Sequence, residues 1–354
     1  MPKLKAGVIG ATGYAGAELV RLLLSHPNVE LAAVSSVSYE GKPLSEIYPS
    51  LAGCCDALLT NDQAVLQTSD VVFASLPHGH SEPYARACME QGKVFIDLGA
   101  DFRLYNEQDY RDWYGLCYAD PALHQKAVYA LPELYRDQIK NARLLGNPGC
   151  YPTSIALGLA PALRRQFIDA NTLVLDSKSG VTGAGRGLSQ NTHYPDCNEA
   201  FAPYKVAGHR HTPEIEQTLS DVAGVPVKVT FVPHLLPVNR GIVSTMYASL
   251  CQDVPLEAIH QAYCAFYQKG AVCAHPAAGQ HRQPKACQML ELLRYFPAPG
   301  PPHPTVDRGF RHRQYGERGR RAGHSKYESR MRIPRDLRPY PGPTRILRKR
   351  GSFL

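Results

Sequence analysis

The stretch Lys3-Leu-Lys-Ala-Gly-Val-Ile-Gly-Ala-Thr-Gly-Tyr-Ala-Gly16 places Gly10, Gly13 and Gly16 at intervals of three residues, directly after a short apolar run. Residues 17–25 follow with apolar side chains at helical spacing, so the pattern predicts a strand, a glycine turn and a helix. In this context a glycine turn favours dinucleotide binding, although such a turn also serves simply to connect a strand to a helix. We expect Gly10 to permit the tight turn, Gly13 to let the backbone approach a pyrophosphate, and Gly16 to allow close helix–strand contact.

Further apolar runs extend this unit into a sheet. Residues 29–34, 70–77 and 93–99 are nearly continuous in apolar side chains, which is typical of parallel strands buried on both faces. Ligands of such sheets bind beyond the carboxyl ends of the strands, where Ser75 and Pro77 fall. The predicted fold class is therefore α/β.

A different arrangement follows residue 150. Residues 227–233 and 241–250 predict antiparallel strands, and residues 255–269 predict an amphipathic helix. We therefore predict a Rossmann-type NADP-binding domain over residues 1–149 and an α+β catalytic domain with a mixed sheet over residues 150–269.

The end of the second predicted strand bears on the choice of cofactor. Ser35 and Ser36 stand where an NAD site usually has an acidic residue that binds the ribose 2′-hydroxyl. No carboxylate there would repel a 2′-phosphate, so the sequence favours NADP(H), although two serines also suit the start of a loop. A glycine-dense segment at residues 176–187 suits either a backbone approach to a ring or phosphate, or a surface loop. The residues expected to bind the cofactor are Gly10, Thr12, Gly13, Tyr14, Ala15, Gly16, Ser35, Ser36, Ser75, Pro77, Ser179 and Gly180.

A cysteine between two prolines marks the expected reaction centre. In Asn147-Pro-Gly-Cys-Tyr-Pro-Thr-Ser154, a strand ends at residue 146 and residues 151–163 predict a helix, which puts Cys150 at a helix N-terminus. The helix dipole there lowers a thiol pKa and favours the nucleophilic thiolate. Gly149 would allow a sharp turn that leaves the sulfur accessible. The alternative is a buried core thiol, which we expect for most of the other nine cysteines.

His209-Arg-His-Thr-Pro-Glu214 supplies the expected proton-transfer groups. Thr212 predicts a helix N-cap, with Pro213 as the first helical residue. A histidine near a cysteine can take its proton and later return one, as a general base must. Two histidines at this spacing also suit a metal, but no third ligand stands at a suggestive spacing, so we predict no metal site.

Five motifs in order resemble the N-acetyl-gamma-glutamyl-phosphate reductase family of arginine biosynthesis, which is akin to aspartate-semialdehyde dehydrogenase. The motifs are Gly10-Ala-Thr-Gly-Tyr-Ala-Gly16, Asp97-Leu-Gly-Ala-Asp-Phe-Arg-Leu104, Pro148-Gly-Cys-Tyr-Pro-Thr153, Ser179-Gly-Val-Thr-Gly-Ala-Gly-Arg186 and His209-Arg-His-Thr-Pro-Glu214. The resemblance covers about residues 4–269. It implies an NADPH-dependent enzyme that acts on a small-molecule acyl phosphate and assembles as a homo-oligomer, either a dimer or a tetramer.

The resemblance also implies roles for individual residues. Cys150 would attack the acyl phosphate of N-acetyl-glutamyl 5-phosphate, expel phosphate and form a thioester. Hydride from NADPH would then give a thiohemiacetal that collapses to the 5-semialdehyde. His211 would serve as acid and base, although the division of roles between the two histidines stays open, and Glu214 could orient an imidazole. The residues expected to contact substrate are Arg103, Asn147, His209, Arg210 and Glu214.

Two other functions remain open at this point. A related reductase acts on a carrier-bound aminoadipyl phosphate in lysine biosynthesis, and the motifs separate it only weakly from the first choice. Reduction of aspartyl phosphate fits the motifs less well. A protein of a different class, a nucleotide-binding regulator without catalysis, would keep the glycine turn and lose turnover.

The charge of the chain divides it into two parts. The 354 residues carry a net charge of +8, but residues 270–354 hold 18 Lys and Arg against five Asp and Glu, whereas the first 269 residues hold 21 against 26. The excess positive charge therefore predicts no nucleic-acid partner for the body of the protein. No apolar run reaches about 18 residues, which predicts no membrane span. The dispersed cysteines suit reduced thiols and a cytoplasmic location.

Residues 270–354, the tail, depart from the family pattern. They hold 11 of the 29 prolines and only four Val or Ile, a composition typical of irregular structure. Family members carry an Asn-Leu-x-Lys-Gly-Ala-Ala type motif near the nicotinamide, and the tail has no such motif. We interpret the tail as a shift of reading frame near residue 270, with a nucleic-acid-binding extension or a divergent folded end as alternatives. Because the second domain is then incomplete, we expect this chain to be inactive or poorly soluble.

Overall fold

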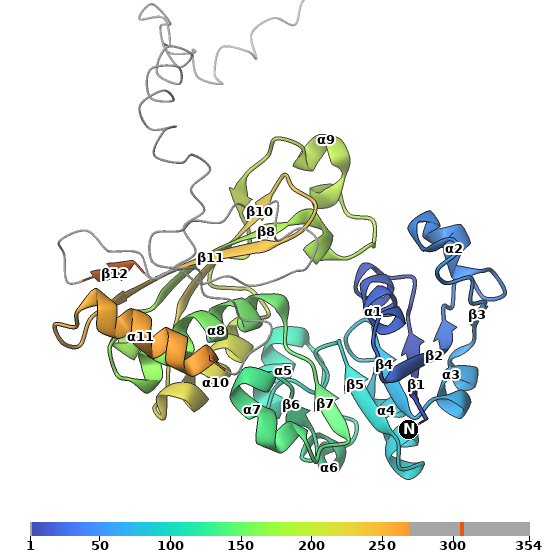
Figure 1. The fold of residues 1–354 in the computed structure, drawn as a ribbon. Coiled ribbons are helices and arrows are strands. Elements are labelled where there is room, and N and C mark those ends of the chain that lie inside the picture. The colour runs from blue at the N-terminus through green and yellow to red at the C-terminus, as the bar shows by residue number, and fades with distance from the viewer. Residues whose placement is uncertain (1, 269–304, 308–354) are drawn as a thin grey trace, which may run out of the picture. The chain divides into compact units, whose positions relative to one another are not determined.

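The computed structural model describes residues 2–268 and 305–307. The strands of these residues form two sheets, one from strands up to residue 146 and one from strands after residue 173 (Figure 1). The predicted α/β class, with a Rossmann-type sheet and a mixed sheet, is confirmed. None of the described helices is long and apolar enough to cross a bilayer.

The first sheet has seven parallel strands. They are β1 (Leu4–Ile9), β2 (Val29–Ser35), β3 (Leu59–Thr60), β4 (Val71–Ala74), β5 (Val94–Asp97), β6 (Val128–Tyr129) and β7 (Leu144–Gly146). Their order is β3-β2-β1-β4-β5-β7-β6, so β1 lies between β2 and β4 and the winding direction reverses there. Ligands of such sheets bind outside the strand carboxyl ends at this switch point.

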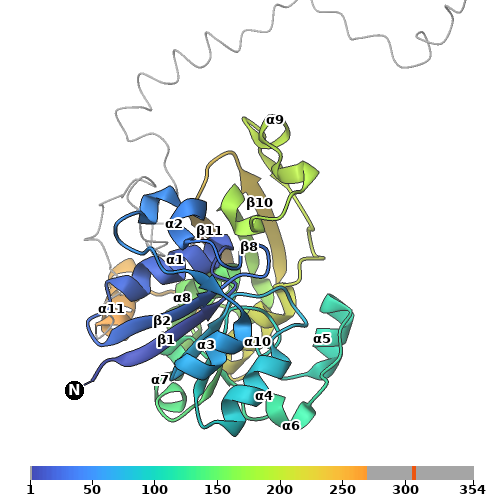
Figure 2. The ribbon, with the colours of Figure 1, turned by 90° about the vertical axis from the view of Figure 1, so that its right-hand side faces the viewer.

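Helices cover both faces of the first sheet, which explains its continuous apolar strands. They are α1 (Tyr14–Leu24), α2 (Leu44–Ile47), α3 (Asp62–Thr68), α4 (Glu82–Glu90), α5 (Glu107–Tyr114), α6 (Pro121–His124) and α7 (Pro132–Ile139). Figure 2 shows α1 and α2 on one side of β1 and β2, and α3 and α4 on the other. Accordingly Val8 and Ile9, consecutive in β1, belong to two hydrophobic clusters, the first with Val20 of α1 and the second with Val65 of α3.

The glycine turn follows β1 as predicted, but its helix begins three residues earlier than the pattern indicated. Gly13, at φ −71° and ψ 161°, is already the N-cap of α1. Gly10 has φ +79°, a left-handed conformation that favours glycine. A Cβ on Gly16 would lie 2.3 Å from the Gly10 carbonyl oxygen. The third glycine is therefore needed for close packing of helix against turn.

The second sheet is mixed and has the order β12-β11-β8-β10-β9. Its strands are β8 (Val174–Gly180), β9 (Ala202–Pro203), β10 (Thr230–Leu236), β11 (Ile242–Ser249) and β12 (Thr305–Asp307). The predicted strands at residues 227–233 and 241–250 are present, but β8 separates them, pairing parallel with β10 and antiparallel with β11. β10 begins only at residue 230, because the Val227 amide donates instead to the Ser220 hydroxyl.

Helices α8 (Cys150–Arg164), α10 (Thr212–Ala223) and α11 (Leu256–Tyr267) lie on one side of this sheet (Figure 1), while the short α9 (Tyr194–Cys197) lies between β8 and β9 in the chain. Most of α8 is buried, which makes it the central helix of this domain. Pro161 inside α8 has no N–H for the Leu157 carbonyl, and the Tyr267 hydroxyl of α11 donates to that carbonyl instead. The four 3-10 helices of the described residues are Pro49–Leu51, Ala170–Thr172, Val181–Ala184 and Gln190–Thr192.

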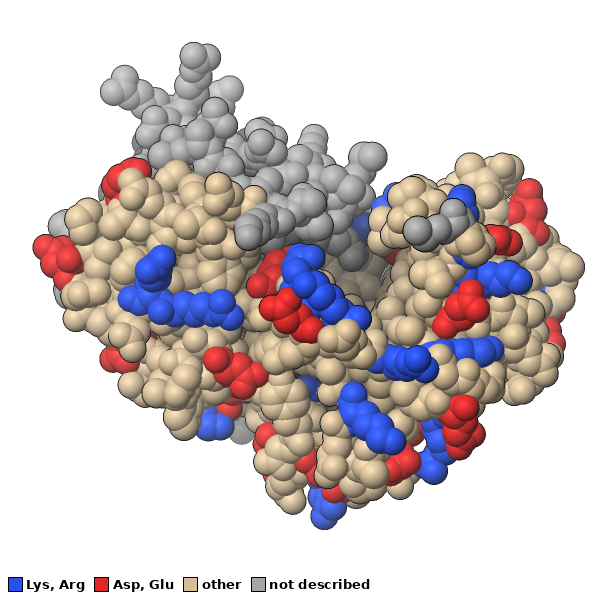
Figure 3. Space-filling view, turned by 60° about the horizontal axis from the view of Figure 1, so that its bottom comes forward, with Lys and Arg blue, Asp and Glu red and all other residues tan. Residues whose placement is uncertain are grey.

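The opposite face of the second sheet is partly exposed, as Val174, Asp176 and Lys178 of β8 are. On the molecular face in Figure 3, Lys and Arg are interspersed with Asp and Glu. Within the tail, β12 pairs antiparallel with β11. The rest of the tail, with its predicted irregular structure and its expected effect on activity, lies outside the described residues.

Candidate active site

Cys150 is the first residue of α8, as the sequence predicted, and it is exposed. Gly149, the N-cap, has φ −66° and ψ 157°, which any residue can adopt, so the expected sharp turn is not the reason for glycine. A Cβ at this position would lie 2.6 Å from His211 Nε2 and 3.0 Å from Glu214 Oε2. Glycine is therefore required because two side chains from the start of α10 pack against the backbone beside the cysteine.

Glu214 fastens this backbone to α10. Its side chain is fully buried, and Oε1 accepts hydrogen bonds from the Gly149 amide at 2.7 Å and from the Tyr129 hydroxyl at 2.8 Å. Oε2 lies 3.5 Å from Arg103 Nη1. Among the hydrogen bonds of the described residues, Glu214 has none to an imidazole; it orients the peptide before Cys150 instead.

Arg103 is buried and joins three segments. Its Nε donates to the Asn147 carbonyl at 2.8 Å, and its Nη2 donates to the Leu98 carbonyl at 2.7 Å. Together with the contact to Glu214, these bonds tie the segments after β5 and β7 to α10. The Asn147 amide is itself held by the Asp97 carbonyl at 2.8 Å. Both residues, which the resemblance assigns to substrate, thus have extensive contacts within the protein.

The surroundings of Cys150 act on its pKa in opposite directions. Although the side chain is exposed, desolvation by the surrounding protein raises the pKa of the thiol, and this is the largest effect. The Arg103 guanidinium and the backbone amides of Cys150 and Tyr151 lower the pKa. The predicted net lowering of the pKa by the helix dipole is therefore wrong, because desolvation outweighs it. At neutral pH the resting thiol is protonated and needs a base.

His209 and His211 lie beside the two residues that flank Cys150. Their rings are 4.9 Å apart, and the ring of Tyr151, the residue after Cys150, lies 5.5 Å from His209 and 5.9 Å from His211. The His211 amide donates to His209 Nδ1 at 3.1 Å, so the neutral His209 ring carries its proton on Nε2. His211 is also the N-cap of α10, one residue before the predicted cap at Thr212.

Both imidazoles are neutral at pH 7. Burial, assisted by the charges of Lys205 and Arg210, lowers the pKa of His209 to about 4. Burial, assisted by the Arg103 guanidinium, lowers the pKa of His211 well below its usual value. Either ring is thus able to accept a proton from a thiol, and His211 Nε2 is the nitrogen that lies against Gly149.

The structure adds His78 and Tyr114, which sequence reasoning missed. His78 directly follows Pro77 after β4, and its Nδ1 accepts from the Ala100 amide at 3.2 Å. Its ring packs edge-on to Tyr114 at 5.1 Å, and the Arg210 guanidinium lies over the same Tyr114 ring at 5.5 Å. Burial and the charge of Arg210 lower the pKa of His78 to about 4. Its position one residue beyond the strand-end motif was the signal that could have identified it.

The glycine turn leaves the start of α1 without a side-chain cap. A Cβ on Gly13 would meet nothing closer than 3.6 Å, and no side chain caps the first turn of α1, where Tyr14 and Ala15 stand. The Ser75 carbonyl oxygen closes the other side, 2.4 Å from where a Gly10 Cβ would lie. These residues fit a dinucleotide, because backbone amides that no side chain caps are able to bind a pyrophosphate.

The two serines after β2 point to different partners. Ser36 Oγ lies 2.8 Å from Thr12 Oγ1 in the glycine turn. Ser35 Oγ donates at 2.5 Å to the carboxylate of Asp62, which also accepts from the Tyr84 hydroxyl at 2.6 Å. Only the side chain of Ser36 contacts the glycine turn, whereas Ser35 reaches it through its carbonyl, which accepts from the Ala11 amide at 3.0 Å. Asp62 is a nearby carboxylate that the sequence reasoning missed.

The glycine-dense segment after β8 spans both parts of the site. Ser179 lies near Tyr151, the residue after Cys150, and acts to lower the pKa of that phenol. A Cβ on Gly180 would lie 2.8 Å from the backbone of Asn239, which explains this glycine by packing. Further along, Arg186 Nη1 donates to the Thr12 carbonyl at 2.9 Å. The predicted cofactor residues Ser179 and Gly180 therefore lie in a segment that reaches from the cysteine to the glycine turn.

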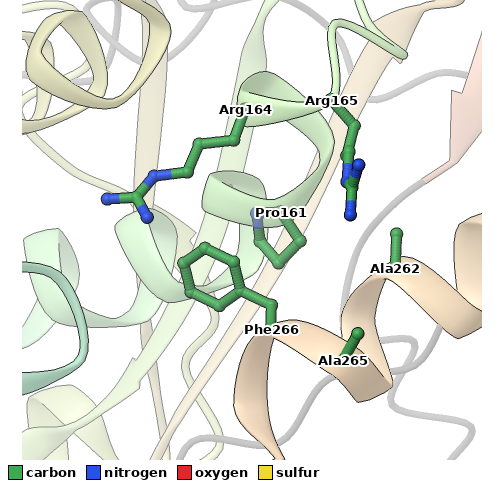
Figure 4. A pocket seen from close by; sticks show the side chains of 6 residues that line it. All are labelled: Pro161, Arg164, Arg165, Ala262, Ala265 and Phe266. Carbon is green, nitrogen blue, oxygen red and sulfur yellow. The ribbon is translucent and has the colours of Figure 1, made fainter.

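A surface pocket lies at the other end of α8 (Figure 4). Arg164 and Arg165 at the end of α8, with Phe266 of α11, form part of its lining, and the Arg164 guanidinium stacks over the Phe266 ring at 5.1 Å. A helix of this length separates its two ends by roughly 21 Å. The pocket is therefore distinct from the cysteine site.

Two family models match the chain, one over most of the first sheet and the other over most of the second. The model described as semialdehyde dehydrogenase, NAD binding domain, matches residues 5–142. The model described as semialdehyde dehydrogenase, dimerisation domain, matches residues 150–294. This match extends beyond residue 269, where the resemblance to the family was expected to end.

Solved structures agree on the fold. Aspartate semialdehyde dehydrogenase II of Vibrio cholerae, complexed with ASA, is similar with a TM-score of 0.65 at 13% identity, covering 87% of this chain and 92% of that one. Aspartate semialdehyde dehydrogenase with NADP from Candida albicans is similar with a TM-score of 0.53 at 18% identity, covering 73% and 75%.

Curated relatives are much more similar in sequence. An N-acetyl-gamma-glutamyl-phosphate reductase of Brachyspira hyodysenteriae is 57% identical over 276 residues, which are 76% of this chain and 78% of that protein. Enzymes of the same name from Clostridium beijerinckii and Moorella thermoacetica are 55% and 51% identical, each covering 75% of this chain and 77% of the relative. The chain belongs to the N-acetyl-gamma-glutamyl-phosphate reductase family.

Proposed function

We propose that the protein reduces N-acetyl-glutamyl 5-phosphate to N-acetyl-glutamate 5-semialdehyde and phosphate, with NADPH as reductant and Cys150 as nucleophile. The observation that carries this proposal is the attachment of the cysteine backbone to α10, through the buried bond between Gly149 and Glu214. This bond holds the start of α10, with His211 Nε2 packed against Gly149, beside the helix N-terminus that carries Cys150. The names of the relatives at 51–57% identity support the choice of substrate.

The first half-reaction uses groups of this chain only. His211 Nε2 accepts the proton of Cys150, and the sulfur attacks the acyl carbon. The C–S bond forms, the bond from carbon to the phosphate oxygen breaks, and phosphate leaves with that electron pair. The amides of Cys150 and Tyr151 and the fixed charge of Arg103 lower the pKa of the thiol and so favour the thiolate. The product is a Cys150 thioester.

In the second half-reaction the reduced nicotinamide, when bound, supplies a hydride. The chain holds the acyl group on Cys150 at the start of α8 while the hydride is transferred. When the C–S bond breaks, its electron pair returns to sulfur and the aldehyde leaves. Protonated His211 then returns its proton from Nε2 to the thiolate, which restores the starting state.

Substrate binding and cofactor binding are divided between the two sheets. We place the cofactor at the glycine turn of the residues 1–149 domain and the chemistry in the residues 150–269 domain. Arg210, exposed and stacked on Tyr114, is the cation we assign to the substrate carboxylate. Arg103 acts on the thiol through its charge and through its hold on Asn147. We also assign His209 to contact with the substrate.

The match to a dimerisation domain indicates a homo-oligomer. We propose a dimer or tetramer, which light scattering after gel filtration measures directly. All eight cysteines of the described residues are free thiols, and this supports a cytoplasmic location.

The test is acylation of the enzyme without reductant, because this step does not require the nicotinamide. Full-length protein mixed with N-acetyl-glutamyl 5-phosphate should gain one N-acetyl-glutamyl group on Cys150, seen by peptide mass spectrometry. Cys150→Ser should reduce phosphate release by at least about 1,000-fold. Cys117→Ser, which alters another exposed thiol, is the matched control.

Near-normal phosphate release by Cys150→Ser would rule out the mechanism. Faster acylation by the carrier-bound aminoadipyl phosphate would favour the lysine-pathway alternative. NADPH binding without any acylation would identify a nucleotide-binding regulator.

A further inference from the structure

Arg186 connects the second domain to the glycine turn. It stands in the loop after β8, where Gly185 has φ +90° and turns the chain. The side chain is exposed, and its Nη1 donates to the Thr12 carbonyl at 2.9 Å. A cation from one domain is thereby placed at the edge of the dinucleotide turn of the other.

Aromatic rings hold this guanidinium on a particular side of the turn. Its central carbon lies 5.3 Å from the ring centroid of Tyr48 and 5.8 Å from that of Tyr39. The Tyr48 hydroxyl donates to the same Thr12 carbonyl at 2.9 Å. Both tyrosines belong to the segment that follows β2. Arg186 is therefore fixed against the segment after β2. Ser179, near the end of β8, lies instead near Tyr151, the residue after Cys150.

The segment after β2 is where doubly wound domains bind the adenosine ribose. Ser36 begins this segment and contacts Thr12 Oγ1 at 2.8 Å, so Thr12 touches both Ser36 and Arg186. A guanidinium has five N–H donors, and the contacts with Thr12 and Tyr48 use only part of them. The nearby carboxylate of Asp62 is engaged by Ser35 and Tyr84.

We propose that Arg186 binds the 2′-phosphate of NADPH, so that a loop of the catalytic domain determines the cofactor specificity of the nucleotide domain. This inference rests on the NADPH dependence proposed above. The planar guanidinium suits bidentate hydrogen bonding to a phosphate, and stacking on two tyrosines restricts its orientation before the cofactor arrives. The NADPH preference therefore requires both domains.

Calorimetric titration of the full-length chain tests the proposal without reference to turnover. The ligands are NADPH and NADH, together with adenosine 2′,5′-bisphosphate and 5′-AMP as probes of the 2′-phosphate alone. Arg186→Gln should weaken NADPH and the bisphosphate by about tenfold or more and leave NADH and 5′-AMP unchanged. Arg186→Lys, which keeps the charge and loses the fork, should fall between wild type and Arg186→Gln.

The matched control is Arg240→Gln. Arg240 makes another contact between the domains, with Nη1 3.1 Å from Glu18 Oε2 on α1, but it does not stack on the two tyrosines. It should leave the ratio of NADPH to NADH affinity unchanged. An equal loss of both cofactors in Arg186→Gln, or no loss, would overturn the role in reading the 2′-phosphate. A wild-type chain that binds NADH as tightly as NADPH would instead refute the proposed NADPH dependence.

Discussion

Helices α1 and α8 both follow a parallel strand and both begin at a glycine without a side-chain cap. The two N-caps have nearly the same backbone, with φ −71° and ψ 161° at Gly13 and φ −66° and ψ 157° at Gly149. Their surroundings differ. A Cβ on Gly13 would meet nothing closer than 3.6 Å, whereas one on Gly149 would lie 2.6 Å from His211 Nε2. The same local structure thus leaves room for a side-chain carbon at Gly13, which we assign to the cofactor phosphates, and none at Gly149, beside the nucleophile that we propose.

The largest difference between the two helices should appear in the acylation rate when each N-cap glycine is replaced by alanine. Gly149→Ala should slow acylation of Cys150 by at least about 100-fold, because the Cβ displaces His211 or Glu214 from the cysteine backbone. Gly13→Ala should fold with an unchanged melting temperature and acylate normally, but bind NADPH more weakly. Equal behaviour of the two variants in acylation and calorimetry would remove the distinction between the helices.

A smaller effect should follow from neutralising the buried carboxylate beside α8. Glu214→Gln keeps the shape but leaves the buried Arg103 guanidinium without its counter-charge. We expect a loss of about 3 kcal/mol in the free energy of unfolding, measured by urea denaturation. Glu216→Gln on the same helix, whose partner Lys228 is exposed, is the control and should cost less than about 1 kcal/mol. A stable Glu214→Gln variant would show that the buried pair does not hold the site together.

The surroundings of α8 also predict a pH dependence. Desolvation raises the pKa of Cys150, so alkylation by iodoacetamide should increase about tenfold per pH unit from pH 6 to 8 and continue to increase above pH 9. Acylation by the acyl phosphate should instead persist at pH 6, because His209 and His211 have lowered pKa values and remain neutral there. An alkylation rate that levels off below pH 8 would contradict the raised pKa.

The smallest effect should be on NADPH affinity, when the two serines at the end of β2 are replaced one at a time. Ser36→Ala removes the contact with Thr12 and should weaken NADPH binding by about fivefold, the equivalent of about 1 kcal/mol. Ser35→Ala removes a bond to Asp62 instead, so it should lower the melting temperature slightly and leave NADPH affinity unchanged. The reverse pattern in calorimetry would place Ser35 at the cofactor.

Sequence reasoning succeeded where a pattern is local. The switch from apolar run to glycine turn to amphipathic helix located β1 and α1, and two flanking prolines located Cys150 at the start of α8. It was less accurate where the partner is distant in sequence. β8 separates the two predicted antiparallel strands, and this depends on pairing across more than 50 residues.

The direction of the Cys150 pKa shift could not be predicted from the sequence. A helix dipole is a local property, whereas desolvation depends on which segments gather around the thiol. The same holds for Glu214, whose partners Tyr129 and Gly149 come from elements 65 or more residues away. His78 follows the predicted residue Pro77 directly, but it belongs to no sequence motif that would have identified it.

By itself, the sequence determined the fold class, the glycine turn, the place of Cys150 at the start of a helix and the family, because each depends on residue types at short spacing. The tertiary structure alone decided which groups meet: His211 and Glu214 against Gly149, and Arg186 against Thr12. The physical reason is that packing and desolvation act between segments far apart in the chain. The glycines at the starts of α1 and α8 have nearly the same backbone conformation, and their neighbours alone distinguish the proposed phosphate site from the proposed reaction centre.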